Sequence, residues 1–321
     1  MATAIGVVGS LLGIWTFAED LIPAPEEAAS RYRIQVGKDG SDGGGLQNAG
    51  GSIELIKTYN HNGELMGSGG GGEVKDGGYA DFSAEQEGTQ QSSITEFYAD
   101  NDALCIAYIS ATFAESTKWG WVGDWGYTCG LDWYPSGYEL QNSGGDDQSV
   151  RGPRCTWIDK DHSNDIKAAV LGITWADFYA EPNGPEQEGD GKDHCGAGMR
   201  AWDSNGGTQL LSPDGTAGLA KRSSGHGPRK SRRSTDDRIV VSHRNYHNAT
   251  EVCDSDTSYG PDFVSVAEGL YCDMETHELA PLCGNGVEED CFGLDGPDGP
   301  AMVYKNNKRS NRKVSHVVEW H

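Results

Sequence analysis

Short runs of alternating apolar and polar residues recur along this chain and predict β-strands. The run at 31–36 places Tyr32, Ile34 and Val36 against two arginines and a glutamine, the period-two pattern of a half-buried strand. Further strand candidates lie at 52–59, 104–113, 119–122, 155–158, 170–175, 237–243 and 313–320. Glycine-rich breaks separate the early candidates, and no strand–helix–strand rhythm is present. We therefore predict a mainly β fold, an antiparallel β-sandwich.

One segment shows a different period. Over 262–274, Phe263, Val266 and Leu270 recur at helical spacing, and Asp262 precedes them as an N-cap candidate. This pattern predicts a short helix.

Composition changes along the chain and predicts four regions. Residues 1–30 hold an apolar N-terminal segment, and residues 31–182 hold most of the strand pattern and form the sandwich domain. Residues 183–236 are rich in glycine and proline and then basic, which predicts a linker. Residues 237–321 form a smaller cysteine-containing region that docks on the sandwich.

The apolar stretch at 4–18 has the length of a signal-peptide core but lacks a positively charged start. It is too short for a typical membrane-spanning helix. We interpret it as a weak secretion signal; the alternatives are a packed helix and a membrane-active segment.

The formal net charge of −24, from 49 acidic and 25 basic residues, argues against a nucleic-acid partner. The basic residues cluster in 221–238 and 305–313, against an acidic remainder. Such clusters are typical of solvated segments; charge-steered self-association is the alternative. The dibasic pairs Lys221-Arg222 and Arg232-Arg233 also predict proteolytic processing of the linker.

The cysteine count predicts disulfides and an oxidising compartment, because eight cysteines occur with no C-x-x-C pair. The cysteines are Cys105, Cys129, Cys155, Cys195, Cys253, Cys272, Cys283 and Cys291. Four lie before the basic run and four after it, which leaves pairing within each half and pairing between the halves both open. The sequon at Asn248 predicts N-glycosylation of a secreted chain.

Aromatic residues are concentrated at 118–138, where they either fill the core or bind a ligand. Trp119 and Trp121 share one face of an extended segment. Three other rings lie nearer turn residues and are the predicted exposed, carbohydrate-binding set: Trp125, Trp133 and Tyr134.

The acidic run at 159–165 resembles the first half of a calcium loop, in which oxygen ligands occur at every second residue. The predicted ligands are Asp159, Asp161, Ser163 and Asp165. The loop lacks the expected glycine, because Asn164 is at that position, and the final glutamate is replaced by Val170. Calcium is the one cofactor we consider, and these two departures favour the alternative, a polar turn.

The runs "NDALCIAYISATF", "KWGWVGDWGYTCGLDWY", "CTWIDKDHSN" and "ATEVCDSDTSYGPDFVSVAEGLYCDM" resemble a widespread group of secreted, cysteine-containing fungal proteins. The resemblance covers most of the chain, including the basic run. It implies a fungal extracellular setting and, because the group has no assigned activity, no catalytic residues.

No nucleophile elbow, HExxH or phosphate-loop motif is present in the sequence, so the catalytic residues are unknown. We expect an extracellular binding protein that engages a carbohydrate or cell-wall surface. The first alternative is a secreted hydrolase that uses paired carboxylates and His162. The second is a membrane-active, toxin-like protein that uses 4–18.

Overall fold

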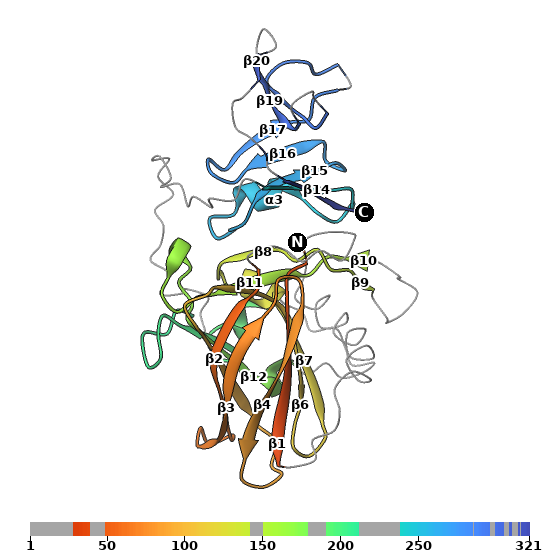
Figure 1. The fold of residues 1–321 in the computed structure, drawn as a ribbon. Helices are drawn as coiled ribbons and strands as arrows, with labels where there is room; N and C mark the ends of the chain where they lie inside the picture. Colours follow the sequence, from red (N-terminus) through yellow and green to blue (C-terminus); the bar gives the residue numbers. More distant parts are fainter. Residues whose placement is uncertain are drawn as a thin grey trace. The chain divides into compact units, whose positions relative to one another are not determined.

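The computed structural model describes ten stretches of the chain, at 28–38, 49–141, 150–178, 191–211, 238–284, 286–295, 299–304, 308–309, 314 and 316–321. The chain divides into two compact units, one within 1–38 and 45–224 and the other within 39–44 and 225–321 (Figure 1). The apolar segment at 4–18 and the predicted processing residues, Lys221, Arg222, Arg232 and Arg233, lie outside the described residues.

The first unit contains an 11-stranded antiparallel sheet with the order β13-β12-β5-β2-β3-β4-β1-β6-β11-β8, in which β7 pairs with β6. Its strands are β1 (Ala29–Val36), β2 (Gly51–Tyr59), β3 (Leu65–Val74), β4 (Tyr79–Gln86), β5 (Ile94–Ala99), β6 (Leu104–Thr112), β7 (Lys118–Val122), β8 (Trp133–Pro135), β11 (Arg154–Ile158), β12 (Val170–Thr174) and β13 (Met199–Trp202). The smaller elements are β9 (Leu140–Gln141), β10 (Val150–Arg151), α2 (Asp124–Thr128), η1 (Ser163–Asp165), η2 (Trp175–Phe178) and η3 (Lys192–His194).

The core of this unit shows that the sheet curls so that distant strands face one another. Tyr32 of β1 and Phe97 of β5 are both fully buried, and their ring centroids are 5.3 Å apart. These strands are not neighbours in the sheet, so their side chains meet across a packed interior. This arrangement of an antiparallel sheet confirms the predicted mainly β, sandwich-type fold.

Strand β13 lies inside the range 183–236 that the sequence analysis assigned to a linker. Its residues pair with β12 at the edge of the sheet, and Cys195 is bonded to Cys129. Residues 191–211 therefore belong to the first unit. The four-residue run of β13 is too short to show a strand period, which is why the sequence pattern missed it.

The second unit contains a five-stranded sheet with the order β17-β16-β15-β14-β21. Its elements are β14 (Arg238–Ser242), α3 (Ala249–Asp254), β15 (Asp262–Ser265), β16 (Leu270–Asp273), β17 (Glu278–Pro281) and β21 (His316–Trp320), and a three-stranded sheet comprises β18 (Cys291–Gly293), β19 (Ala301–Tyr304) and β20 (Lys308–Arg309). Strand β14 is parallel to both β15 and β21, so this sheet is mixed.

The helix predicted over 262–274 is wrong, because this segment is the antiparallel pair β15 and β16. Gly269, with φ of +70°, lies in the turn between the strands, where a residue with a side chain would be strained. Asp262 is not an N-cap: its carboxylate accepts hydrogen bonds from the Tyr271 hydroxyl at 2.7 Å and the Met274 amide at 3.0 Å. Strand β15 is buried on both faces, so its apolar residues do not alternate.

All eight cysteines are paired, and each half of the chain closes its own bridges. The pairs are Cys105–Cys155, Cys129–Cys195, Cys253–Cys272 and Cys283–Cys291. Four disulfides indicate an oxidising environment such as the outside of a cell.

No helix among the described residues combines the length and the apolar character needed to span a bilayer.

Candidate functional site

A pocket of about 270 Å³ lies on the first sheet where β2, β5, β12 and β13 are neighbours. Two rows of paired residues cross these strands, and five of their members line the pocket: Tyr98, Val170, Trp202, Lys57 and Glu96. The rows are Leu55, Tyr98, Val170 and Trp202, then Lys57, Glu96, Gly172 and Arg200. The residues between the rows point the other way, into the core: Ile56, Phe97, Leu171 and Ala201. The pocket therefore occupies the face of the sheet opposite the core.

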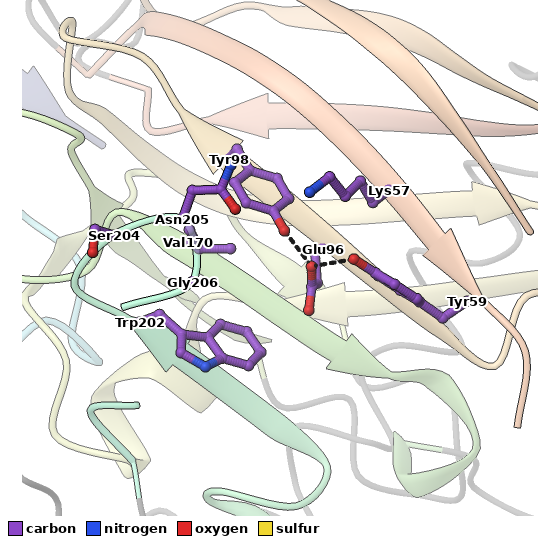
Figure 2. Close-up of a pocket in the computed structure, with 9 residues that line it drawn as sticks. All are labelled: Lys57, Tyr59, Glu96, Tyr98, Val170, Trp202, Ser204, Asn205 and Gly206. Carbon is purple, nitrogen blue, oxygen red and sulfur yellow. Dashed lines mark hydrogen bonds between the residues drawn. The ribbon is translucent and has the colours of Figure 1, made fainter. Parts of the chain in front are cut away.

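Glu96 is the centre of the pocket's hydrogen bonding. The Tyr59 hydroxyl donates to Glu96 Oε2 at 2.9 Å, and the Tyr98 hydroxyl donates to the same oxygen. Figure 2 shows both hydroxyls directed at this carboxylate. Burial, together with the adjacent Glu96 carboxylate, raises the pKa of Tyr59 to about 12 and raises the pKa of Tyr98 further. Both phenols therefore stay protonated and hold Glu96 in place.

Trp202 supplies a half-buried indole beside this carboxylate (Figure 2). Gly172 makes room for it, because a Cβ built on Gly172 would lie 2.8 Å from Cζ3 of the indole. On the other side of the pocket, the Lys57 ammonium lies 4.7 Å from the centroid of the Tyr98 ring. An aromatic surface, a fixed carboxylate and an ammonium thus share one face. The exposed turn at 204–206 completes the lining.

The predicted sugar-binding rings are in a different environment. Trp125, Trp133 and Tyr134 are each no more than 1% exposed, so the prediction that they form an exposed sugar-binding surface is wrong. Trp125 packs on Phe178 with ring centroids 4.9 Å apart, and Trp133 lies under the Arg154 guanidinium. The aromatic stretch thus fills the interior, which was the other reading of its composition.

The residues that line the pocket could be predicted only in part from the sequence. Lys57 and Tyr59 alternate with buried residues along the predicted strand at 52–59, so their shared face could be read from the sequence. Glu96 and Trp202 lie on strands that the sequence analysis did not predict, and no local pattern connects them to Tyr59.

The acidic run at 159–165 forms a polar turn around Ser163. The Ser163 hydroxyl donates to Asp159 Oδ2 at 2.8 Å, and the Ser163 amide donates to Asp161 Oδ1 at 2.8 Å. His162 and Asp165 have left-handed backbone conformations, with φ of 58° and 61°. In the described part of the chain, the three aspartates do not bring three ligand atoms within reach of one ion. This geometry fits the polar-turn alternative, and the calcium interpretation gains no support from it.

Asp159 is expected to make stability depend on pH. Burial of its carboxyl group is the main cause that raises its pKa to about 6, whereas hydrogen bonding from the Ser163 amide lowers the pKa of the exposed Asp161. The folded state thus binds the Asp159 proton more tightly than the unfolded state, and the stability this provides is lost as the pH rises from about 4 to about 6.

Asp159→Asn removes this titration, so its free energy of unfolding relative to the wild type should increase across that pH range. Urea denaturation at several pH values measures the difference. Asp161→Asn is the matched comparison. Because the pKa of Asp161 is lowered, the free energy of unfolding of this variant relative to the wild type should instead decrease as the pH rises, and should do so below about pH 4. If the free energy of unfolding of Asp159→Asn differs from that of the wild type by the same amount at every pH, the pKa of Asp159 is not raised by folding.

The predicted glycosylation residue, Asn248, is exposed at the start of α3. Its side-chain oxygen accepts a hydrogen bond from the Glu251 amide at 2.9 Å and so caps the helix. Glycosylation of Asn248 stays a prediction.

No family model and no curated protein matches this chain. Among solved structures, a Delta413-417:GS LOX is 10% identical over 29% of this chain and 14% of its own, with a TM-score of 0.22. A coral 8R-lipoxygenase, described as activated by calcium through a C2-like domain, is 8% identical over 30% of this chain and 15% of its own, also with a TM-score of 0.22. The matches thus span only a small part of those proteins, and likenesses this slight assign neither family nor activity.

Proposed function

We propose that this protein is an extracellular carbohydrate-binding protein and that the pocket of Tyr59, Glu96, Tyr98 and Trp202 is its sugar site. The observation that carries the proposal is an indole surface beside a carboxylate that two tyrosine hydroxyls hold in place. The four disulfides and the resemblance to secreted fungal proteins support the extracellular setting.

The chemistry of the pocket matches the two faces of a sugar ring. A pyranose presents C–H groups that pack on an aromatic surface, and Trp202 offers such a surface. It also presents hydroxyls that donate to a carboxylate. The tyrosines both use Oε2 of Glu96, and Oε1 makes no hydrogen bond to another described residue, so it is available to a sugar hydroxyl. The pocket is slightly smaller than typical ligand sites of roughly 300–1,000 Å³, which suits one sugar unit of a longer chain.

Binding fits this pocket better than hydrolysis. Glycosidases generally place two carboxyl groups on either side of the scissile bond. Among the described residues that line the pocket, Glu96 is the only carboxylate. His162, considered for the hydrolase alternative, is exposed in the acidic turn, where its Nδ1 lies 2.9 Å from the Ile166 carbonyl oxygen.

A neutral ligand also fits better than a cationic one. Rings of tyrosine and tryptophan beside a carboxylate can bind a quaternary ammonium group. Here, however, the Lys57 ammonium already lies over the Tyr98 ring. A second cation would be repelled by Lys57, whereas a sugar hydroxyl could accept a hydrogen bond from it.

Trp202→Ala is expected to weaken carbohydrate binding at least tenfold, about 1.4 kcal/mol, because it removes the aromatic surface. Titration calorimetry of the full chain with soluble β-glucan, chitin oligosaccharides and mannan measures the affinity. Tyr304→Ala is the control, since Tyr304 is 45% exposed in the second unit. Equal affinity of Trp202→Ala and wild type places binding elsewhere, and failure of the wild type to bind any of these polysaccharides rejects the proposal.

A second variant shifts the Trp202 indole without removing it. The new Cβ in Gly172→Ala would lie 2.8 Å from Trp202 Cζ3, so the ring must move. Binding should fall several-fold while the far-UV circular dichroism spectrum is unchanged. Unaltered affinity would show that carbohydrate binding does not depend on the position of the Trp202 indole over Gly172.

A further inference from the structure

Two parallel strands of the second unit bring two histidines together. Strands β14 and β21 are paired in parallel, with Ser242 opposite Trp320. The residues that follow the two strands, His243 and His321, therefore lie beside each other at the carboxyl ends of these strands. The His243 amide continues the pairing by donating to the Trp320 carbonyl at 2.9 Å. Glu319 is two residues before His321 and thus on its face of β21. Three ligand-type side chains therefore gather at one strand end.

Both imidazoles lie close to the Glu319 carboxylate. His243 Nε2 lies 2.7 Å from Glu319 Oε2, and His321 Nε2 lies 3.6 Å from the same oxygen. The two rings are stacked, with centroids 4.6 Å apart and an interplanar angle of 16°. Arg244 Nε donates to the His321 carbonyl at 3.1 Å, which holds the backbone of that residue.

One ligand atom from each of the three residues lies within 4.8 Å of the others. A zinc ion binds nitrogen and oxygen ligands at about 2.0–2.2 Å, so tetrahedral ligand atoms are about 3.3–3.6 Å apart. Side-chain rotations would bring the three atoms to these separations, and they would also unstack the two imidazoles, because each ring binds a metal ion in its own plane. Among the described residues, no other group of histidine, cysteine or carboxylate side chains meets the same spacing.

We propose that His243, Glu319 and His321 form a binding site for a divalent transition-metal ion, with Zn²⁺ as the expected occupant. Two imidazoles and one carboxylate are a ligand set that zinc takes in proteins, with water in the fourth position. All eight cysteines are in disulfides, so thiolates do not compete for the metal within this chain. The site belongs to the second unit and does not depend on the carbohydrate proposal.

The test is titration calorimetry of Zn²⁺ into the full, disulfide-bonded chain without an affinity tag. The wild type should bind one equivalent at this site, and His243→Ala and His321→Ala should each weaken it at least tenfold. His316→Ala is the matched control, because His316 is an exposed histidine on the same strand. Glu319→Gln keeps a side chain of the same size but removes the anionic ligand and should weaken binding as well.

A second readout identifies the ligands directly. Co²⁺ in a tetrahedral site gives an intense visible absorption, which His321→Ala should lose and His316→Ala should keep. All three ligands are exposed, so the variants should remain folded, as circular dichroism of the metal-free proteins checks. If His243→Ala, His321→Ala and His316→Ala bind Zn²⁺ equally, or if the wild type does not bind, the proposal is overturned.

Discussion

Replacement of Trp175 by alanine is expected to lower the free energy of unfolding of the first unit by about 3–5 kcal/mol. Trp175 is fully buried, and its ring packs against Tyr32 and Phe113 at centroid distances of 6.2 and 5.6 Å. Its Nε1 also donates to Thr95 Oγ1 at 2.9 Å. Alanine leaves a cavity and removes this donor, so the costs of packing and of hydrogen bonding combine. Urea denaturation followed by near-UV circular dichroism measures the loss.

Two further variants separate these causes. Trp175→Phe keeps a ring but removes the N–H donor, and it should cost less than alanine. Tyr304→Ala removes an exposed ring and should change stability by no more than about 0.5 kcal/mol. If Trp175→Ala costs less than about 1 kcal/mol, the interior is not closed around this indole as the ring contacts indicate.

Loss of the Cys129–Cys195 disulfide, as a double alanine variant, is expected to cost about 4 kcal/mol. The bonded residues are 66 apart, and the chain-entropy model gives a larger stabilisation for a longer closed loop. The bridge also ties the segment that carries β13 to the end of α2. Because β13 carries Trp202, this variant should weaken carbohydrate binding too, if the pocket is the sugar site.

The comparison is Cys283–Cys291, whose residues are only 8 apart, so the same model gives about 2.5 kcal/mol for its removal. Denaturation of both double variants, with the transition of each unit followed separately, measures the two losses. A loss from the short bridge as large as that from the long one would contradict the loop-length argument. Unchanged affinity of the Cys129–Cys195 variant would show that β13 holds its position without the bridge.

Several strands were predictable because their patterns are local. The runs at 31–36 and 52–59 alternate, and both are strands of the first sheet. Other strands were not predictable for equally local reasons. In β3, four successive glycines at 69–72 replace the side chains that would show a period. Strand β15 is buried on both faces and showed no alternation. Burial on both faces did not by itself hide a strand, because the long apolar run at 104–113 was predicted and is the buried strand β6.

The pocket was less predictable than the strands that build it. Tyr59, Glu96 and Trp202 lie on three different strands, and only the pairing of β2, β5, β12 and β13 makes them neighbours. A shift of one residue in any of these pairings would turn a side chain from the pocket to the core. Three rings of the aromatic stretch at 118–138 were assigned to the surface because their burial likewise depends on the curl of the sheet: Trp125, Trp133 and Tyr134.

By itself, the sequence determined that this is a mainly β, acidic chain whose eight cysteines suit an oxidising environment, because alternation, charge and cysteine number are properties of short segments or simple counts. Only the tertiary structure decided which cysteines pair, that 191–211 belong to the first unit, and which rings line a pocket. These features depend on contacts between residues far apart in the chain, and such contacts follow from strand order, register and the curl of the sheet, which no short segment encodes.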